Sequence, residues 1–398
     1  WHGTMTAVTA AGSGTLSHGL YRGIASEADV VLIKVMNTKK RRISRQDIVR
    51  ALEWVMDHAE EHAIRIISMS VYDDEPGSAD DNPVNRAVEK AVEKGIVVVA
   101  ASGNTPHHPL FPPANAPSAI TVGGLDDRNE LSNEARRLFH STYGKMSDGS
   151  TKPDVIAPAI WIAGPILPHT DQFREAPVLF RLLAAKPGMA ERILRQHRRD
   201  LTKVPKKLDK HTCKAWARKR IAEMQYVAPF YKHVDGTSFA APIVSAVIAQ
   251  MLEAHPLLTP ADVKKIVMET AEPLKNAAQE QQGRGVLCPR AAVLAALRQL
   301  HTDLQPGGHT VDGRVLFIYH NRVPRRVAVA GSFNNWDTQS LLLQESHDGW
   351  WSAWMPKPRA GVHQYKYVVD DSVWMEDPAN KDKVPDGFGG WNSRLAVN

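Results

Sequence analysis

The first three hundred residues alternate short apolar runs with segments of helical period, and this alternation constrains the fold more than any other feature. Apolar runs at 28–37, 64–71 and 96–102 have the length and composition of buried strands. Between them, residues 44–63 and 83–95 repeat apolar side chains at helical spacing. Strands that alternate with helices in this way are typical of parallel pairing. We therefore predict an α/β fold whose mainly parallel sheet has helices on both faces.

Local signals mark where several of these helices begin and end. Ser44 and Asp47 have the spacing of a capping box, and Gly95 is placed to end a helix as its C-cap. Thr259 is a predicted N-cap, with Pro260 in the first turn that follows it. Later helices are predicted at 237–255, 259–271 and 289–301.

A basic segment interrupts the alternation between about residues 165 and 230. The chain carries a net charge of +6, and residues 173–223 hold fifteen Lys or Arg against five Asp or Glu. This segment is helix-prone and contains several prolines, so we interpret it as a helical insertion. A solvated helical decoration is one reading. A lid, or a surface for an acidic partner, a nucleic acid or a membrane, is the other.

The composition excludes some classes of protein. Only Cys213 and Cys288 occur, which excludes a disulfide scaffold and a cysteine-rich zinc site. No apolar run approaches the ~18–20 residues that a membrane-spanning helix needs, so we predict no transmembrane segment.

Three short motifs carry residues suited to acyl-transfer chemistry. They are His2-Gly3-Thr4, the strand end Gly103-Asn104, and Gly236-Thr237-Ser238 before an apolar helix. A serine hydroxyl becomes nucleophilic when an imidazole accepts its proton. The resulting oxyanion needs donors, which are often a side-chain amide and a backbone N–H at a helix N-terminus. Each motif alone fits an ordinary turn or helix start; together they indicate a catalytic serine.

These motifs resemble those of the subtilisin-like serine peptidases. "HGTMTA" resembles the histidine block of that family, "AASGN" its oxyanion-asparagine block, and "DGTSFAAPIVSAVIA" its serine block. The resemblance covers residues 1 to about 300. It implies that Ser238 is the nucleophile, that His2 is the general acid/base, and that Asn104 donates to the oxyanion. No cofactor is implied for catalysis.

The same resemblance implies a substrate-binding edge. Tyr72 stands where the family usually has glycine, so we expect narrower subsites on the side of the substrate that precedes the cleaved bond. The implied substrate-binding residues are Ser70, Val71, Tyr72, Ala101, Ser102 and Gly103. The implied substrate is a polypeptide.

The family's catalytic aspartate has no counterpart in the expected place. It lies upstream of the histidine in that family, whereas here only Trp1 precedes His2, and Asp29 begins a predicted strand after it. We expect the aspartate to lie upstream of Trp1, and this polypeptide without it to be nearly inactive, since losing it costs subtilisin ~3 × 10⁴ in turnover. A catalytically dead peptidase fold, acting as a carbohydrate-binding or scaffolding protein, is the alternative. Structural calcium occurs in relatives, but no cluster of ligands predicts a metal site.

The last ninety residues have the alternation of an all-β module. After a predicted linker at 301–312, residues 313–398 resemble the glycogen-binding module of the AMP-activated kinase beta subunit, which is an immunoglobulin-like sandwich. We expect core roles for Trp350, Trp351 and Trp354. The resemblance implies that this module binds an α-glucan, with aromatic rings stacking on sugars and polar groups binding hydroxyls. The implied binding residues are Trp336, Lys366, Trp374, Phe388 and Asn392, where Phe388 replaces a leucine of the kinase module.

Overall fold

The computed structural model describes residues 1–36, 42–73, 81–106, 109–130, 132–146, 148–186, 188–205, 212–311 and 313–397. The chain divides into two compact units. The first comprises Trp1–Gln250 and Thr259–Pro289, and the second comprises Met251–Leu258 and Arg290–Asn398.

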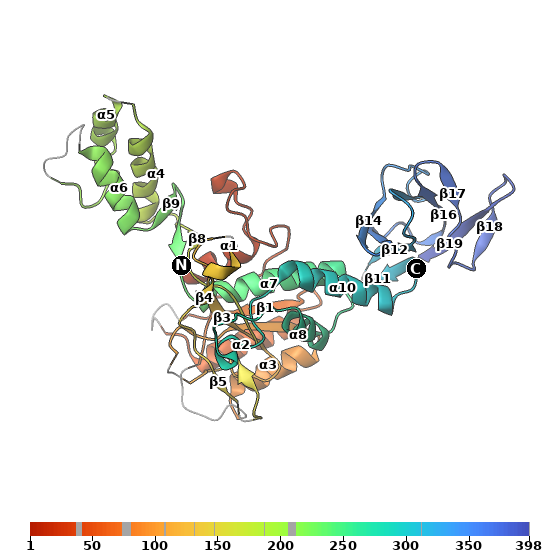
Figure 1. Cartoon of the computed structure of the whole chain (residues 1–398), viewed down its shortest axis with the longest axis horizontal. Coiled ribbons are helices and arrows are strands. Elements are labelled where there is room, and N and C mark those ends of the chain that lie inside the picture. The colour runs from red at the N-terminus through yellow and green to blue at the C-terminus, as the bar shows by residue number, and fades with distance from the viewer. Residues whose placement is uncertain are drawn as a thin grey trace. The chain divides into compact units, whose positions relative to one another are not determined.

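A mainly parallel sheet lies at the centre of the first unit (Figure 1). Its strands are β1 (Ile66–Met69), β2 (Val97–Ala101), β3 (Ile120–Asp126), β7 (Val155–Pro158) and β4 (Arg137–Leu138). β1, β2, β3 and β7 pair in parallel in that order, and β4 adds an antiparallel edge to β3. The α/β class with a mainly parallel sheet is therefore confirmed.

Two helices cover one face of this sheet. α2 (Arg45–His58) and α3 (Pro83–Glu93) pack on each other, and their buried side chains join Met69 and Val98 in one apolar core. The end signals read from the sequence hold: Ser44 accepts a hydrogen bond from the Asp47 N–H, and Gly95 follows α3 with φ 84°. Glycine suits this left-handed position because it lacks a Cβ.

The opposite face is also covered. Successive side chains of a strand point to opposite faces, and Val97 and Val99 are as fully buried as Val98. α8 (Pro260–Glu269) also contacts β2, and it begins at the predicted N-cap Thr259, which forms a capping box with Asp262. α7 (Thr237–Ala254) is long and apolar enough to cross a membrane by length and composition alone. Because 67% of its window is buried inside the fold, it reads as a core helix.

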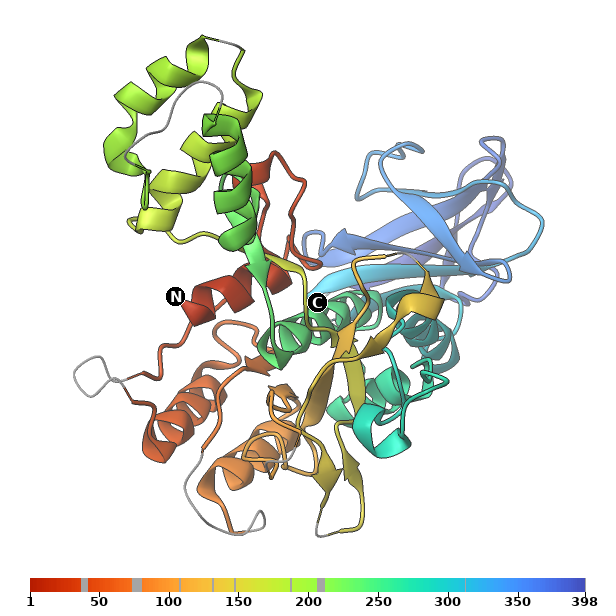
Figure 2. The ribbon, with the colours of Figure 1, turned by 60° about the vertical axis from the view of Figure 1, so that its left-hand side comes forward.

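Residues 165–230 form a helical subdomain on a short ribbon (Figure 2). The ribbon consists of β8 (Ile162–Pro165), β10 (Tyr231–Val234) and β9 (Tyr226–Ala228), all antiparallel. Beyond it, α4 (Asp171–Ala184), α5 (Met189–Gln196), η3 (Arg198–Asp200) and α6 (Cys213–Glu223) enclose their own apolar core. The remaining elements of the first unit are α1 (His2–Ala11), η1 (Thr15–Ser17), η2 (Asn133–Ala135), β5 (Gly144–Lys145), β6 (Thr151–Lys152) and α9 (Gln279–Gln282).

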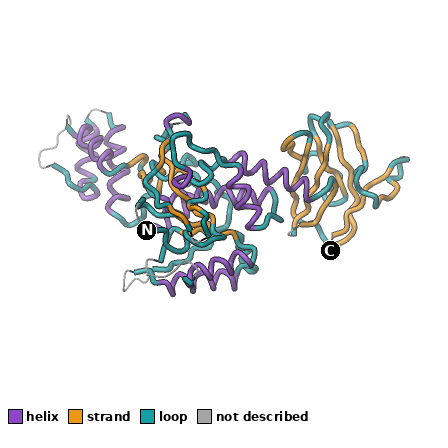
Figure 3. Tube along the Cα trace, turned by 60° about the horizontal axis from the view of Figure 1, so that its bottom comes forward, coloured by secondary structure: helices purple, strands orange, loops and turns teal. Residues whose placement is uncertain are grey.

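The second unit joins one helix to antiparallel β-structure (Figure 3). In its described part the strands pair in the order β11-β12-β15-β14-β13-β16-β19-β18, with β17 added to β16. The buried side chains of Phe317, Val329, Trp351 and Tyr367 fill the space between the layers. The elements are α10 (Pro289–Asp303), β11 (Gly307–Val311), β12 (Arg314–His320), β13 (Val327–Gly331), β14 (Leu342–His347), β15 (Trp350–Pro356), β16 (Gly361–Val369), β17 (Val373–Met375), β18 (Lys383–Pro385) and β19 (Trp391–Val397).

The predicted linker at 301–312 differs from the structure. Its first residues complete α10, and Gly307–Val311 form β11, which pairs along its whole length with β12. Leu300 of α10 packs with Leu316 and Ile318, and the partly buried rings of Trp350 and Trp354 join them. Glycine and proline in this stretch suggested a connector, but the apolar side chains on either side of it bury together.

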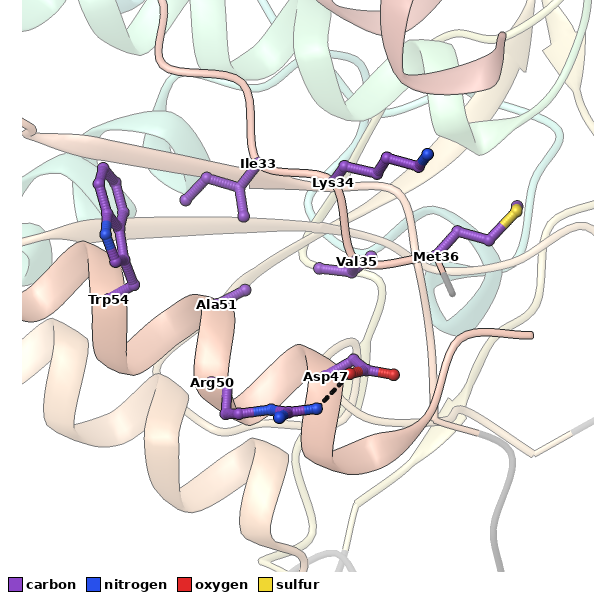
Figure 4. A pocket seen from close by; sticks show the side chains of 8 residues that line it. All are labelled: Ile33, Lys34, Val35, Met36, Asp47, Arg50, Ala51 and Trp54. Carbon is purple, nitrogen blue, oxygen red and sulfur yellow. Dashed lines mark hydrogen bonds and ion pairs between the residues drawn. The ribbon is translucent and has the colours of Figure 1, made fainter. Parts of the chain in front are cut away.

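The predicted strand at 28–37 is also wrong over its described residues, 28–36. These residues form no strand, and Val30, Val31, Leu32 and Ile33 are all exposed. In the described part of the sheet β1 pairs with β2 alone, and the segment does not pair with the edge that β1 leaves open. Instead it runs beside α2, where residues 33–36 and Trp54 line a surface hollow (Figure 4). An apolar run predicts burial only when a neighbouring strand accepts its hydrogen bonds.

Candidate functional site

Ser238 lies in the first turn of α7. Gly236 precedes this turn with φ 127°, and its N–H donates to the carbonyl of Ala159 at 2.6 Å. Ser238 itself is half-buried. The N–H groups of a first helical turn have no partner within the helix, so the Ser238 N–H is free to donate outward. The turn therefore presents a hydroxyl and a backbone donor together.

Asn104 is held against the same turn by its side-chain carbonyl. Its Oδ1 accepts from the Thr237 N–H at 2.9 Å and from the Thr237 hydroxyl at 3.0 Å. The Thr237 Oγ1 in turn accepts from the Gly103 N–H at 3.1 Å. Both acceptor positions of the amide are thus occupied, whereas Nδ2 donates to no described residue. The amide is an anchored donor beside Ser238.

His2 begins α1 and approaches the serine turn. Its ring centroid lies 6.0 Å from that of Phe239, the residue after Ser238, and 5.8 Å from that of Trp1. Burial lowers the pKa of His2. A neutral imidazole is the form that accepts a proton. The ring makes no hydrogen bond with Ser238, or with any carboxylate in the described part of the chain.

The edge formed by residues 70–72 is joined to the serine turn. The Ser70 hydroxyl donates to the backbone carbonyl of Ser238 at 2.9 Å. Val71 is half-buried, and Tyr72 is 59% exposed with its ring stacked 5.7 Å from that of Phe111. Ala101, Ser102 and Gly103 lead from β2 to Asn104. The structure thus places Ser70, Asn104 and His2 against the start of α7, and the other predicted site residues of the first unit adjoin Ser70 or Asn104 along the chain.

Several residues at this site escaped the sequence analysis. His140 meets the carbonyl of Asn104 through Nδ1 at 2.8 Å, and the Thr142 N–H donates to the Gly103 carbonyl at 3.0 Å. Asp73, buried beside the edge, accepts from Arg45 at 2.6 Å and from Asn82 at 2.8 Å. These contacts join segments far apart in the sequence, and no local pattern predicts them.

Two further predictions concern a carboxylate partner for His2 and a metal site. Asp29 is exposed in the segment without strand structure and makes no contact with His2. Across the described ranges, no group of three or more His, Cys, Asp or Glu side chains could hold a metal ion.

The five predicted sugar-binding residues lie in the second unit, on β16, β17, β19 and two loops. Trp336 packs against buried Ala330 and Val368, with its ring 6.4 Å from that of Trp374. Trp374 pairs in register with Val368, so both side chains point to the same face of the sheet. This face therefore carries two tilted indole rings, of which Trp374 is 45% exposed.

Polar groups continue the same face. The Lys366 ammonium contacts the Asp386 carboxylate at 2.5 Å, and Asn392 donates to the Gln364 carbonyl oxygen at 2.9 Å. Asp386 also accepts from the N–H of Phe388, which lies in the loop between β18 and β19 and is 95% exposed. These hydrogen bonds and the Lys366 charge lower the pKa of Asp386 to about 2, with the Lys366 hydrogen bond the largest cause. The aromatic and polar groups form one ordered surface.

The expected role in the sandwich core is confirmed for Trp351, whereas Trp350 and Trp354 are partly buried in a separate cluster. Trp351 is buried in the sandwich, and its Nε1 donates to the Asn321 carbonyl at 2.9 Å. Trp350 and Trp354 pack with α10, where the Arg314 guanidinium lies 4.4 Å above the Trp354 ring.

Comparison with known proteins places both regions. Residues 1–285 match the family model described as the Subtilase family. Residues 314–398 match the family model described as the glycogen recognition site of AMP-activated protein kinase.

Curated relatives of the first region are proteases. Serine protease AprX of Bacillus subtilis is 29% identical over 298 residues, which are 72% of this chain and 56% of that protein. Subtilisin-like proteinase Mp1 of Magnaporthiopsis poae is 30% identical over 42% of this chain and 38% of its own length. The chain thus spans about half or less of these two relatives.

Among solved structures, the self-cleaved protease domain of PatA is 21% identical, with a TM-score of 0.48, and covers 74% of this chain and 83% of its own. Because the subtilase model spans well over half of the chain and contains its serine, histidine and asparagine motifs, this protein belongs to the subtilase family of serine proteases, and it carries a C-terminal region of the glycogen-recognition family.

Proposed function

We propose that the first unit is a serine-type endopeptidase, with Ser238 as nucleophile, His2 as general acid/base and Asn104 as oxyanion donor. The observation that carries this proposal is the pair of hydrogen bonds that the Thr237 N–H and hydroxyl donate to the Asn104 amide oxygen. Because that oxygen is anchored, the NH₂ group is left to donate beside Ser238. A pre-positioned donor of this kind stabilises charge that develops in the transition state.

The reaction follows from these positions. The Ser238 oxygen attacks the peptide carbonyl carbon while His2 accepts the hydroxyl proton. The oxyanion receives hydrogen bonds from the Asn104 amide and the Ser238 N–H. When the intermediate collapses, His2 returns the proton to the leaving amine, and water then hydrolyses the acyl ester by the same route.

The substrate is proposed to bind as an extended strand. Residues 70–72 and 101–103 flank the serine turn, and their backbone can pair with a polypeptide, which is the β-augmentation mode of recognition. A Ser-His pair also needs a carboxylate that orients the imidazole. No described residue supplies this carboxylate, so the labelling experiment below uses the full-length natural protein.

A fluorophosphonate probe tests the nucleophile directly. We expect the natural protein to be labelled at Ser238, and the Ser238→Ala variant to lose the label. Ser245→Ala is the matched control, because Ser245 lies in the same helix, buried, with its hydroxyl donating to the Ala241 carbonyl. Absence of label at Ser238 would instead support a non-catalytic carbohydrate-binding or scaffolding protein built on a peptidase fold.

For the second unit, the proposed ligand is an α-glucan. Support comes from the two indole rings and the Lys366 and Asn392 side chains that share one sheet face. Indole rings suit the C–H faces of sugars, and the charged and amide groups suit hydroxyls.

Co-sedimentation with glycogen tests this ligand. We expect Trp336→Ala and Trp374→Ala each to lower retention at least several-fold. Trp391→Ala is the matched control: Trp391 is 48% exposed, and strand alternation turns its side chain away from the face that carries Asn392. Unchanged retention in both test variants would contradict direct glucan binding.

A further inference from the structure

The helical subdomain is attached next to the catalytic serine. Its ribbon pairs Ile162 with Val234, four residues before Ser238. Below the ribbon, the Trp161 N–H donates to Asp235 at 3.2 Å, and His233 meets the Trp161 carbonyl at 2.9 Å. α1, which begins with His2, packs against β8. The subdomain is therefore anchored through elements that also carry the candidate catalytic residues.

The subdomain has an interior of its own, so it presents a fixed surface. Glu175 and Arg220 form a buried ion pair at 3.1 Å, and Thr202 and Tyr226 also bind the Glu175 carboxylate. A buried carboxylate that accepts hydrogen bonds from several side chains holds the helices that carry them in one fixed position. Cys213 and Ala217 of α6 pack on α4 in the adjoining apolar core.

The outer surface of this subdomain is cationic. α5 exposes Arg192 and Arg195 one turn apart, and η3 exposes Arg198 and Arg199 directly after it. Over the described part of the subdomain, the exposed acids Asp171 and Glu223 are paired with Arg174 and Arg220, and the third exposed acid, Glu191, lies on α5 beside Arg192. The exposed basic side chains that form no ion pair among described residues are Arg181, Lys186, Arg192, Arg195, Arg198, Arg199, Lys203, Arg218 and Lys219, which we name the basic face.

The aromatic and apolar side chains of the subdomain indicate which kind of anionic partner it can bind. Phe173, Phe180 and Trp216 pack into the subdomain core, which removes the aromatic platforms on which single-stranded nucleic acids stack. In the described part of the subdomain, Met189 is the one large apolar side chain that is exposed. A helix that lies on a membrane needs a whole apolar face. The partner must therefore be recognised by charge alone, beside a site proposed to act on polypeptides.

We infer that the basic face is an exosite that recruits acidic polypeptide segments to Ser238. This inference rests on the proposed peptidase function and names its substrate class. Arginine binds carboxylates through paired N–H donors, and charge attraction raises the local concentration of acidic chains next to the serine turn. Substrates with Asp- or Glu-rich segments outside the cleaved bond are then preferred.

Binding and cleavage are tested separately. The binding arm uses the natural protein with Ser238→Ala and measures fluorescence anisotropy of a labelled Glu-rich peptide and of its Gln-substituted counterpart. The triple variant R192E/R195E/R199E is expected to bind the Glu-rich peptide on the order of tenfold more weakly, since three attractive charges become repulsive ones. The milder R192Q/R195Q/R199Q is expected to give a smaller loss in the same direction. A control, K94E/K145E/R284E, changes the net charge equally at exposed sites elsewhere in the first unit.

The cleavage arm uses two peptides that share one cleaved sequence and differ in an acidic or neutral tail. We expect the triple variant to raise KM for the acidic-tailed peptide alone and to leave kcat for both unchanged, because the face contributes binding and not chemistry. Equal binding of the Glu-rich and Gln-rich peptides would overturn the exosite. Tighter binding of duplex DNA, or of phosphatidylglycerol vesicles, than of the Glu-rich peptide would overturn it also. If Ser238 is not a nucleophile, neither peptide is cleaved while the binding arm still reports on the exosite.

Discussion

At the scale of single residues, Thr237 is the contact on which the candidate oxyanion donor depends. Its hydroxyl and N–H both bind the Asn104 carbonyl oxygen, and it accepts from Gly103. Thr237→Val keeps the shape but removes the hydroxyl, so the amide loses one of two anchors. We expect kcat to fall about tenfold with KM little changed, since one hydrogen bond contributes ~1 kcal/mol. Steady-state kinetics measure this, and Thr237→Ser is expected to restore the rate. Loss of stability without a change in kcat would contradict the role.

Tyr72 gives a second prediction at this scale. Its exposed ring stacks on Phe111 at the candidate substrate edge. Removing the ring with Tyr72→Gly opens that edge, so we expect bulky substrate side chains before the cleaved bond to gain roughly tenfold in kcat/KM relative to small ones. Profiling with a peptide library measures the ratio. Phe111→Ala serves as comparison and should shift preference in the same direction; a Tyr72→Gly profile identical to the natural one would refute the proposal.

The sequence predicted which residues meet at the start of α7 but not how they are held. Ser238, Asn104 and His2 were recognisable because each belongs to a short motif with its own chemistry. The hydrogen bonds of Thr237 to the Asn104 side chain and of His140 to the Asn104 carbonyl could not be recognised from the sequence, because they depend on loop geometry. Loop contacts between distant segments leave no periodic pattern.

At the scale of elements, α10 and the sandwich are joined by a cluster of histidines. His301 is buried, stacks on Trp350 at 4.6 Å, and neither of its ring nitrogens has a partner in the described structure. Burial, together with the nearby His347, His255 and His320, lowers the pKa of His301 to about 4. The positive charge of Arg298 acts on His347 in the same cluster. Asp303, an acid of α10, contacts His255 at 2.8 Å.

This cluster predicts acid sensitivity of the second unit. The folded pKa of His301 lies below its value of 6.5 in an unfolded chain, so folding favours the neutral ring. The stabilisation is complete above pH 6.5 and is lost as pH falls from about 6.5 to about 4, by on the order of 2–3 kcal/mol. Urea unfolding across this range measures the loss. His301→Phe keeps a ring against Trp350 and should flatten the profile; a profile as steep as that of the natural protein would show that another group is responsible.

The elements also show where pattern reading succeeds. α2 and α8 begin at the predicted caps, and α3 ends before the predicted Gly95, because a cap is decided by residues within one turn. The run at 28–37 failed because a strand requires a partner that local sequence does not specify. In the described structure this segment does not pair with the open edge of β1, and Val30 and Val31 are exposed.

At the scale of the whole molecule, the boundary between the two units is the feature that the sequence located least well. A polar connector at 301–312 suggested that the C-terminal module begins at 313. The structure instead assigns 290–398 to one unit, together with Met251–Leu258. Leu316 and Ile318 are fully buried, and Leu300 of α10 supplies part of their cover. The β-module therefore extends its core into a helix that reads, in sequence, as the end of the preceding domain.

This boundary predicts how fragments behave. A fragment 313–398 lacks β11 and α10, which leaves one edge of β12 unpaired and uncovers Leu316 and Ile318. Uncovered apolar surface costs about 25 cal/mol per Å², and an open strand edge promotes aggregation. We expect 290–398 to melt cooperatively and to stay monomeric, and 313–398 to melt at least several degrees lower and to aggregate on heating. Differential scanning calorimetry with light scattering compares them. Fragment 290–398 with Leu300→Ala should fall between the two, because it keeps β11 and loses one packed side chain, whereas equal stability of both fragments would place the boundary back at 313.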